Sequence, residues 1–158
     1  MNEALQRIKA AREAIWDHEP AEVAQLDGRK AAWNQAASTV LYATTKLATL
    51  ITFLNHMRGV ARAGGVDLAT IKAVTEPYLE FHAGVFGGFY RFSKTAAVVR
   101  WAKEALPEVT TLQEYATLIG ELAVYLNRVD YWIDLRIHWA DLGRAFEQKL
   151  QKAGRIAG

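Results

Sequence analysis

The sequence predicts an all-α protein, an elongated helical bundle of about four main helices with long rods that partly protrude. Between turn signals, apolar residues recur every three or four positions, and no stretch alternates as a strand would. Helix breakers are few, and they stand where helix ends are expected: Glu19-Pro20, Asp27-Gly28, Gly64-Gly65, Glu76-Pro77 and Leu106-Pro107. Because 158 residues with ordinary globular composition suffice for one core, we expect a single domain over residues 1–158.

The first two elements follow from apolar spacing. Residues 1–27 form an N-terminal helical segment, either packed in the bundle or a separate arm, with one apolar face interrupted by Arg12: Leu5, Ile8, Ile15 and Trp16. A second helix is predicted from about Arg29 to Ala63, with spacings of four and three that are typical of a bundle: Trp33, Ala37, Val40, Thr44, Leu47, Ile51 and Leu54.

A short helix capped by Asp67 should follow, and Pro77 then starts or kinks a third long segment. In that segment apolar residues recur every seven positions: Tyr78, Val85, Phe92, Val99 and Leu106. This repeat predicts a helix that continues to about Leu106.

The last helix opens with Thr111 and Glu114, the pattern of a capping box, and meets no strong breaker before Gly154. About 42 residues at 1.5 Å each give a rod of roughly 63 Å, whereas a compact chain of this length has a radius of gyration of about 15 Å. A first apolar stripe occupies the first half of the rod: Leu112, Tyr115, Ile119, Leu122, Leu126, Val129 and Ile133. A second apolar stripe begins midway along the rod: Trp132, Leu135, Trp139, Leu142 and Phe146. We expect this stripe to meet either the first helix or another subunit.

Charge is distributed unevenly along the chain, although the net charge is only +2. No Asp or Glu occurs in residues 28–66 or 81–103, and these ranges hold nine cations: Arg29, Lys30, Lys46, Arg58, Arg62, Arg91, Lys94, Arg100 and Lys103. Solvated helices usually mix both signs, so this pattern favours a surface that faces a polyanion. Solvated cations in a chance pattern are the alternative.

Three glycines, Gly84, Gly87 and Gly88, stand among aromatic residues in the second acid-free range. A missing side chain lets another backbone come close, and that neighbour is either a packed helix or a nucleic-acid backbone.

Catalytic and metal-binding patterns are weak. The chain has no cysteine, and it lacks phosphate-binding glycine loops and nucleophile elbows. Asp134, His138 and Asp141 share a helical face, but salt bridges explain them better than a metal, and His82 is expected to be a hydrogen-bonded core histidine. We therefore predict no enzyme activity, no metal, no cofactor and no small-molecule substrate.

The long rods, the absence of cysteine and the acid-free helices together resemble the layout of the helical major coat proteins of filamentous archaeal DNA viruses. The resemblance concerns architecture and rests on no shared motif. It implies paired subunits that wrap double-stranded DNA, with a lipid envelope around some members. The first helix departs from this pattern, because Glu3, Glu13 and Asp17 accompany its basic residues.

The leading hypothesis is accordingly a capsid-like structural nucleoprotein. The nine cations would contact the DNA backbone without sequence specificity, and the stripe from Trp132 to Phe146 would join identical or paralogous subunits. Its location would be the virion, after synthesis in the host cytoplasm, since no signal peptide or convincing membrane span is evident. The alternative is a cytoplasmic, non-enzymatic helical-bundle module that binds a protein partner through the same stripe.

Overall fold

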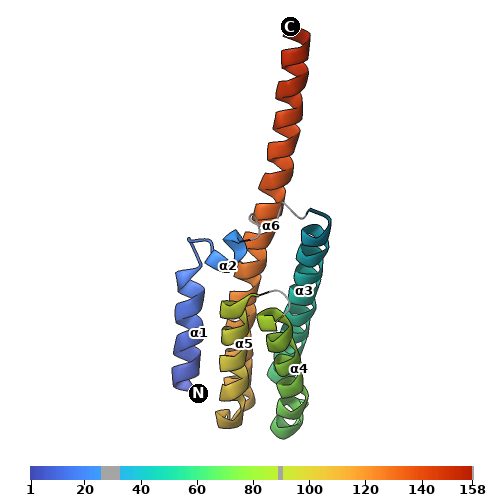
Figure 1. Ribbon diagram of the computed structural model, residues 1–158. Helices are drawn as coiled ribbons and strands as arrows, with labels where there is room; N and C mark the ends of the chain where they lie inside the picture. Colours follow the sequence, from blue (N-terminus) through green and yellow to red (C-terminus); the bar gives the residue numbers. More distant parts are fainter. Residues whose placement is uncertain (26–32, 89–90, 158) are drawn as a thin grey trace.

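The computed structural model describes the backbone of residues 1–25, 33–88 and 91–157, together with their side chains except those of 33–43, 137–146 and 155–157 (Figure 1). Every regular element in this part of the chain is helical, which confirms the all-α prediction. The elements, in chain order, are α1 (Asn2–Ala14), α2 (Ala21–Ala24), α3 (Trp33–Ala63), α4 (Leu68–Gly88), α5 (Ser93–Ala105), a 3₁₀ turn (Leu106–Glu108) and α6 (Leu112–Ala157).

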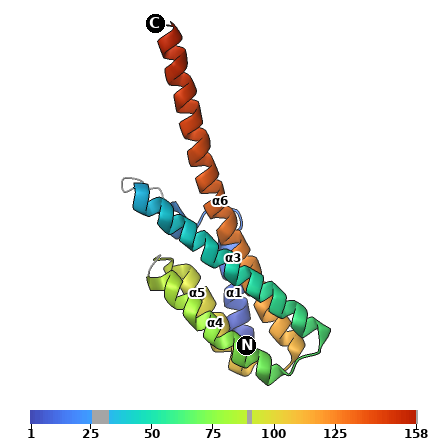
Figure 2. The ribbon, with the colours of Figure 1, turned by 90° about the vertical axis from the view of Figure 1, so that its right-hand side faces the viewer.

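The N-terminal part of α6 is the axis of the bundle. α3 packs along it, α1 packs against both α5 and α6, and α4 and α5 form a hairpin (Figures 1 and 2). The first apolar stripe of α6 is buried from Tyr115 to Ile133, as its spacing predicts, whereas Leu112 is half-buried. Leu118 and Tyr125, on other faces of the helix, are buried as well. No helix among the described residues is long and apolar enough to cross a membrane.

The region from Pro77 to Leu106 differs from the prediction of one continuous rod. α4 runs through Pro77, and the chain reverses after Gly88 before α5 begins at Ser93. Arg91 takes a left-handed conformation with φ of 58°, and the backbone N–H of Phe92 donates to the carbonyl oxygen of Phe86 at 2.7 Å. This contact closes the end of α4 and turns the chain into a hairpin.

The hairpin explains one of the three glycines. A Cβ atom added to Gly87 would lie 3.2 Å from the Cβ of Ala96, whereas one on Gly84 or Gly88 would meet no atom within 4 Å. The helix-packing interpretation is therefore confirmed at Gly87, where α4 and α5 come close together.

Two helix starts are capped in different ways. The predicted cap of α6 is confirmed, because the Glu114 backbone N–H donates to Thr111 Oγ1 at 3.0 Å. α5 has no such cap at Phe92. Instead Glu22, from α2, accepts the backbone N–H groups of Lys94 at 3.0 Å and Thr95 at 3.1 Å, and also the Thr95 hydroxyl. A remote carboxylate thus satisfies the positive end of α5.

Burial raises the pKa of the Glu22 carboxyl, despite the opposing hydrogen bonds from Thr95 and Lys94. A raised pKa in the folded state means that this group contributes stability below its unfolded pKa, and that the contribution is lost as pH rises through the folded value. We predict that the free energy of unfolding of the native protein, measured relative to Glu22→Gln by urea denaturation, decreases between pH 4 and pH 7.

The matched control is Glu3→Gln, since the Glu3 side chain is 82% exposed. Its difference from the native protein should stay nearly constant over the same pH range. If the difference in the free energy of unfolding between the native protein and Glu22→Gln is also constant with pH, this would contradict the proposed role of burial at Glu22.

Candidate interaction surfaces

The nine predicted nucleic-acid contacts lie in several different environments. Arg29 and Lys30 are outside the described residues. On α5 and α3, two lysines stack on aromatic rings: Lys94 Nζ lies 4.8 Å from the centroid of Trp101 and Lys46 Nζ lies 5.4 Å from that of Phe81. Lys103 forms an ion pair with Glu80. An acidic side chain from another helix thus pairs with a cation of an acid-free range. The charge pattern along the sequence does not show this contact.

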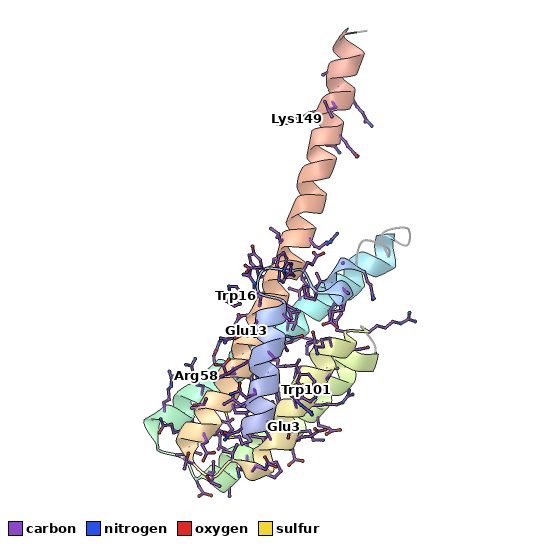
Figure 3. All side chains as sticks on the ribbon, turned by 90° about the vertical axis from the view of Figure 1, so that its left-hand side faces the viewer. Glu3, Glu13, Trp16, Arg58, Trp101 and Lys149 are labelled. Carbon is purple, nitrogen blue, oxygen red and sulfur yellow. The ribbon has the colours of Figure 1, made fainter. Side chains whose placement is uncertain are left out.

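The four remaining cations fall into two pairs. Arg91 and Arg100 are exposed in the hairpin region. Arg58 and Arg62, near the end of α3, line a cavity of about 550 Å³ against α6. Arg58 is labelled in Figure 3 beside the lower part of α6, well apart from Trp101 on α5. The contact of all nine with one DNA backbone stays a prediction.

An aromatic cluster fastens the end of α1 to α6. We call it the aromatic clasp, and it consists of Trp16, Arg128, Tyr131 and Trp132. The Trp132 indole N–H donates to the carbonyl oxygen of Ile15 at 2.7 Å. The guanidinium carbon of Arg128 lies 4.5 Å from the Trp16 ring centroid, 4.1 Å from that of Tyr131 and 5.3 Å from that of Trp132.

The clasp includes Trp132, the first residue of the predicted subunit interface. Trp132 contacts its own chain, which was one of the two alternatives, and Leu135 is half-buried. The side chains of Trp139, Leu142 and Phe146 lie outside the described residues. Just beyond the clasp, Arg136 forms an ion pair with Glu19, with a 2.7 Å hydrogen bond from Nε.

Beyond Arg136, α6 extends past the ends of the other helices. We call residues 137–157 the helical extension, and Figures 1 and 2 show it projecting past every other element. Residues 147–154 are all exposed, and Leu150 has 72% of its surface in solvent. Lys149 is labelled on this projecting rod in Figure 3. The prediction of a partly protruding rod is confirmed.

The histidine predicted for the core is confirmed. His82 is buried, and its Nδ1 lies 2.9 Å from the carbonyl oxygen of Tyr78. Burial lowers the pKa of His82, which favours a neutral ring that donates from Nδ1. Within the described part of the chain, no three His, Asp or Glu side chains converge as metal ligands. Asp134 is exposed there, and the side chains of His138 and Asp141 are outside it.

These features define a helical-bundle domain whose last helix continues beyond the bundle. The family model that matches the chain describes the cucumopine synthase C-terminal helical bundle domain, and it covers residues 1–135. The chain belongs to this family. No curated protein and no solved structure matches it. The match ends one residue before the Arg136 ion pair that marks the start of the helical extension.

We predict that Trp132→Phe, which removes the indole N–H, lowers the free energy of unfolding by about 1 kcal/mol, because the buried carbonyl of Ile15 loses its donor. Urea denaturation measures this loss. Amide hydrogen exchange should also be faster in α1, since the variant loosens the contact that holds its end.

Tyr131→Phe is the control for this change, because Tyr131 is 44% exposed and the substitution keeps an aromatic ring under Arg128. Equal effects of the two substitutions on α1 exchange would show that the Trp132 hydrogen bond is not what holds α1.

Proposed function

We propose that the protein is a non-enzymatic association domain whose helical extension pairs with the extension of a second copy. The observation that carries this proposal is the course of α6. Its 21 residues beyond Arg136 correspond to about 31 Å of helix, and the other described helices do not accompany them (Figure 1).

The extension has the composition of a helix that packs on another helix. The second apolar stripe, which starts at Trp132, continues along the extension at spacings of three and four. It runs through Trp139, Leu142 and Phe146 to Leu150. Isolated helices gain little stability in water unless an apolar face is covered. The exposed side of Leu150 is therefore a surface that a partner would bury.

A second copy fits this surface better than a polyanion does. The described residues of the extension carry both signs of charge, with Glu147 beside Lys149 and Lys152. Such mixed charges can form ion pairs between two copies of the helix. In a twofold arrangement, the apolar stripe of one copy packs against the same stripe of the other.

The family description supports an accessory role. It names a helical bundle at the C-terminus of a synthase, and a bundle attached to an enzyme can serve assembly rather than chemistry. In keeping with this role, three of the buried polar residues have structural contacts: Glu22 caps α5, and the Thr75 and Tyr115 hydroxyls bond each other at 2.6 Å.

The coat-protein hypothesis shares the association step and adds double-stranded DNA as a partner, a paralogous subunit as a possible second chain, and contact with a lipid envelope in the virion. It stays a prediction. The stacked and paired states of Lys94, Lys46 and Lys103 favour association without nucleic acid.

We predict that Leu150→Glu weakens self-association by about tenfold or more, because each copy would bury a carboxylate in place of a leucine side chain. Analytical ultracentrifugation over a range of concentrations measures the dissociation constant. Gln148→Glu is the matched control, since it adds the same charge to an exposed position on the opposite side of the helix, and it should associate as the native protein does.

A native protein that stays monomeric at high concentration would overturn the proposal. The 260 to 280 nm absorbance ratio of the purified assembly separates the two functions. A protein-only spectrum in an associated state supports the association domain, and nuclease-protected nucleic acid in filaments would replace it with the coat protein.

A further inference from the structure

The cavity between the end of α3 and the start of α6 has the size and charge of a ligand site. Its volume of about 550 Å³ lies within the usual range for small-molecule pockets. Two arginines from α3 face the first three turns of α6 across it, and its polar lining residues are: Arg58, Arg62, Gln113, Thr117 and Glu121.

Arg58 is held against α6 and forms no ion pair with an acidic side chain in the described part of the chain. Its side chain crosses α6 at Gly120, where an added Cβ would lie 3.2 Å from Nε and 3.4 Å from the guanidinium carbon. Arg58 is half-buried, and its Nε is fully covered and has no hydrogen-bond partner among the described residues. Because a covered N–H group without an acceptor is costly, the Nε of Arg58 favours an anion in the cavity.

The start of α6 adds to the positive potential. Leu112 and Gln113, the first two residues of a 46-residue helix, line the cavity. Helix geometry leaves the N–H groups of the first turn without intrahelical acceptors, and the helix dipole is positive at this end. Thr111 Oγ1 accepts the N–H of Glu114, and the Glu114 carboxylate accepts the Thr110 and Thr111 hydroxyls at this helix end. Two arginines and the first residues of α6 thus line one space.

Glu121 limits which ligand fits. Its carboxylate lines the same cavity and lies 3.5 Å from Arg12 Nη1, which offsets part of its charge. The cavity thus keeps a positive excess near Arg58 and Arg62 and has one acceptor at Glu121. This arrangement suits a compact anion better than an extended polyanion, whose further charges would approach Glu121.

We propose that this cavity binds a small oxyanion, a phosphate or carboxylate group, with Arg58 and Arg62 as charged donors and Gln113 as a neutral donor. The inference is independent of the association proposed above, since the cavity lies in the bundle and the extension lies beyond it.

The test follows the Nε–H signals of the arginines by NMR in the full chain, while inorganic phosphate or citrate is added at constant ionic strength. We expect a saturable shift of the Arg58 signal with at least one of the two. The anion that binds more tightly assigns the ligand to phosphate or carboxylate chemistry. Sodium chloride at the same ionic strength is the control for general screening.

Two substitutions localise the binding. Arg62→Gln should weaken it by about tenfold, the effect of losing one charged donor, and it should fold normally because Arg62 is exposed. Arg58→Gln should weaken it further. Arg7→Gln, on the exposed side of α1 where Arg7 pairs with Glu3 at 3.0 Å, is the matched control and should bind as the native protein does.

No saturable shift with either anion would overturn the proposal, and so would equal binding by native protein and Arg62→Gln. If Arg58→Gln unfolds, the comparison of Arg62→Gln with Arg7→Gln still decides the question, with circular dichroism to confirm that both are folded.

Discussion

The structure depends on one uninterrupted helix that is buried on several faces at once. Along its N-terminal half, α6 supplies Tyr115 and Tyr125, the largest fully buried side chains among the described residues, and it packs against α1, α2, α3 and α5. The Tyr115 hydroxyl bonds Thr75 of α4 at 2.6 Å, while Trp132 bonds the end of α1. Because an aromatic hydroxyl or indole N–H is stabilised by a partner when it leaves water, these two polar contacts favour the observed positions of α4 and α1 on a largely apolar axis.

Sequence alone predicts the helices better than their connections. The capping pair Thr111 and Glu114 and the first stripe of α6 are local features, so spacing and residue type suffice to find them. The reversal between α4 and α5 is different, because the seven-residue repeat continues through Phe92 as though the helix did. Phe92 is buried in the turn itself, and a buried turn residue has the same periodicity as a buried helix residue. Gly87 indicates locally that another segment packs close to α4, but it does not indicate which segment.

The contacts of charged residues were even harder to predict, because their partners lie far away in the sequence. Glu22 lies 72 residues before Lys94, whose backbone N–H it accepts, so the first turn of α5 has no acid of its own but is capped by a distant one. For the cavity, sequence identified Arg58 and Arg62 as anion contacts but missed Gln113 and Glu121. Gly120 sits within the buried stripe of α6, and only the crossing of α3 shows that its missing side chain makes room for a guanidinium. No periodicity in either helix could reveal that contact.

The family match ends at the point of α6 where its packing against the other helices also ends, and the two ends have a common physical reason. Up to residue 135 the helix is stabilised by neighbours within the domain, so its sequence is constrained by the bundle. After the Arg136 pair those neighbours end, and the described side chains are exposed. Most helical stability in proteins comes from packing of an amphipathic face rather than from intrinsic propensity. The bundle is stabilised by contacts among its own helices, whereas the proposed association with a second copy would cover the stripe of the extension and couple the stability of the extension to protein concentration.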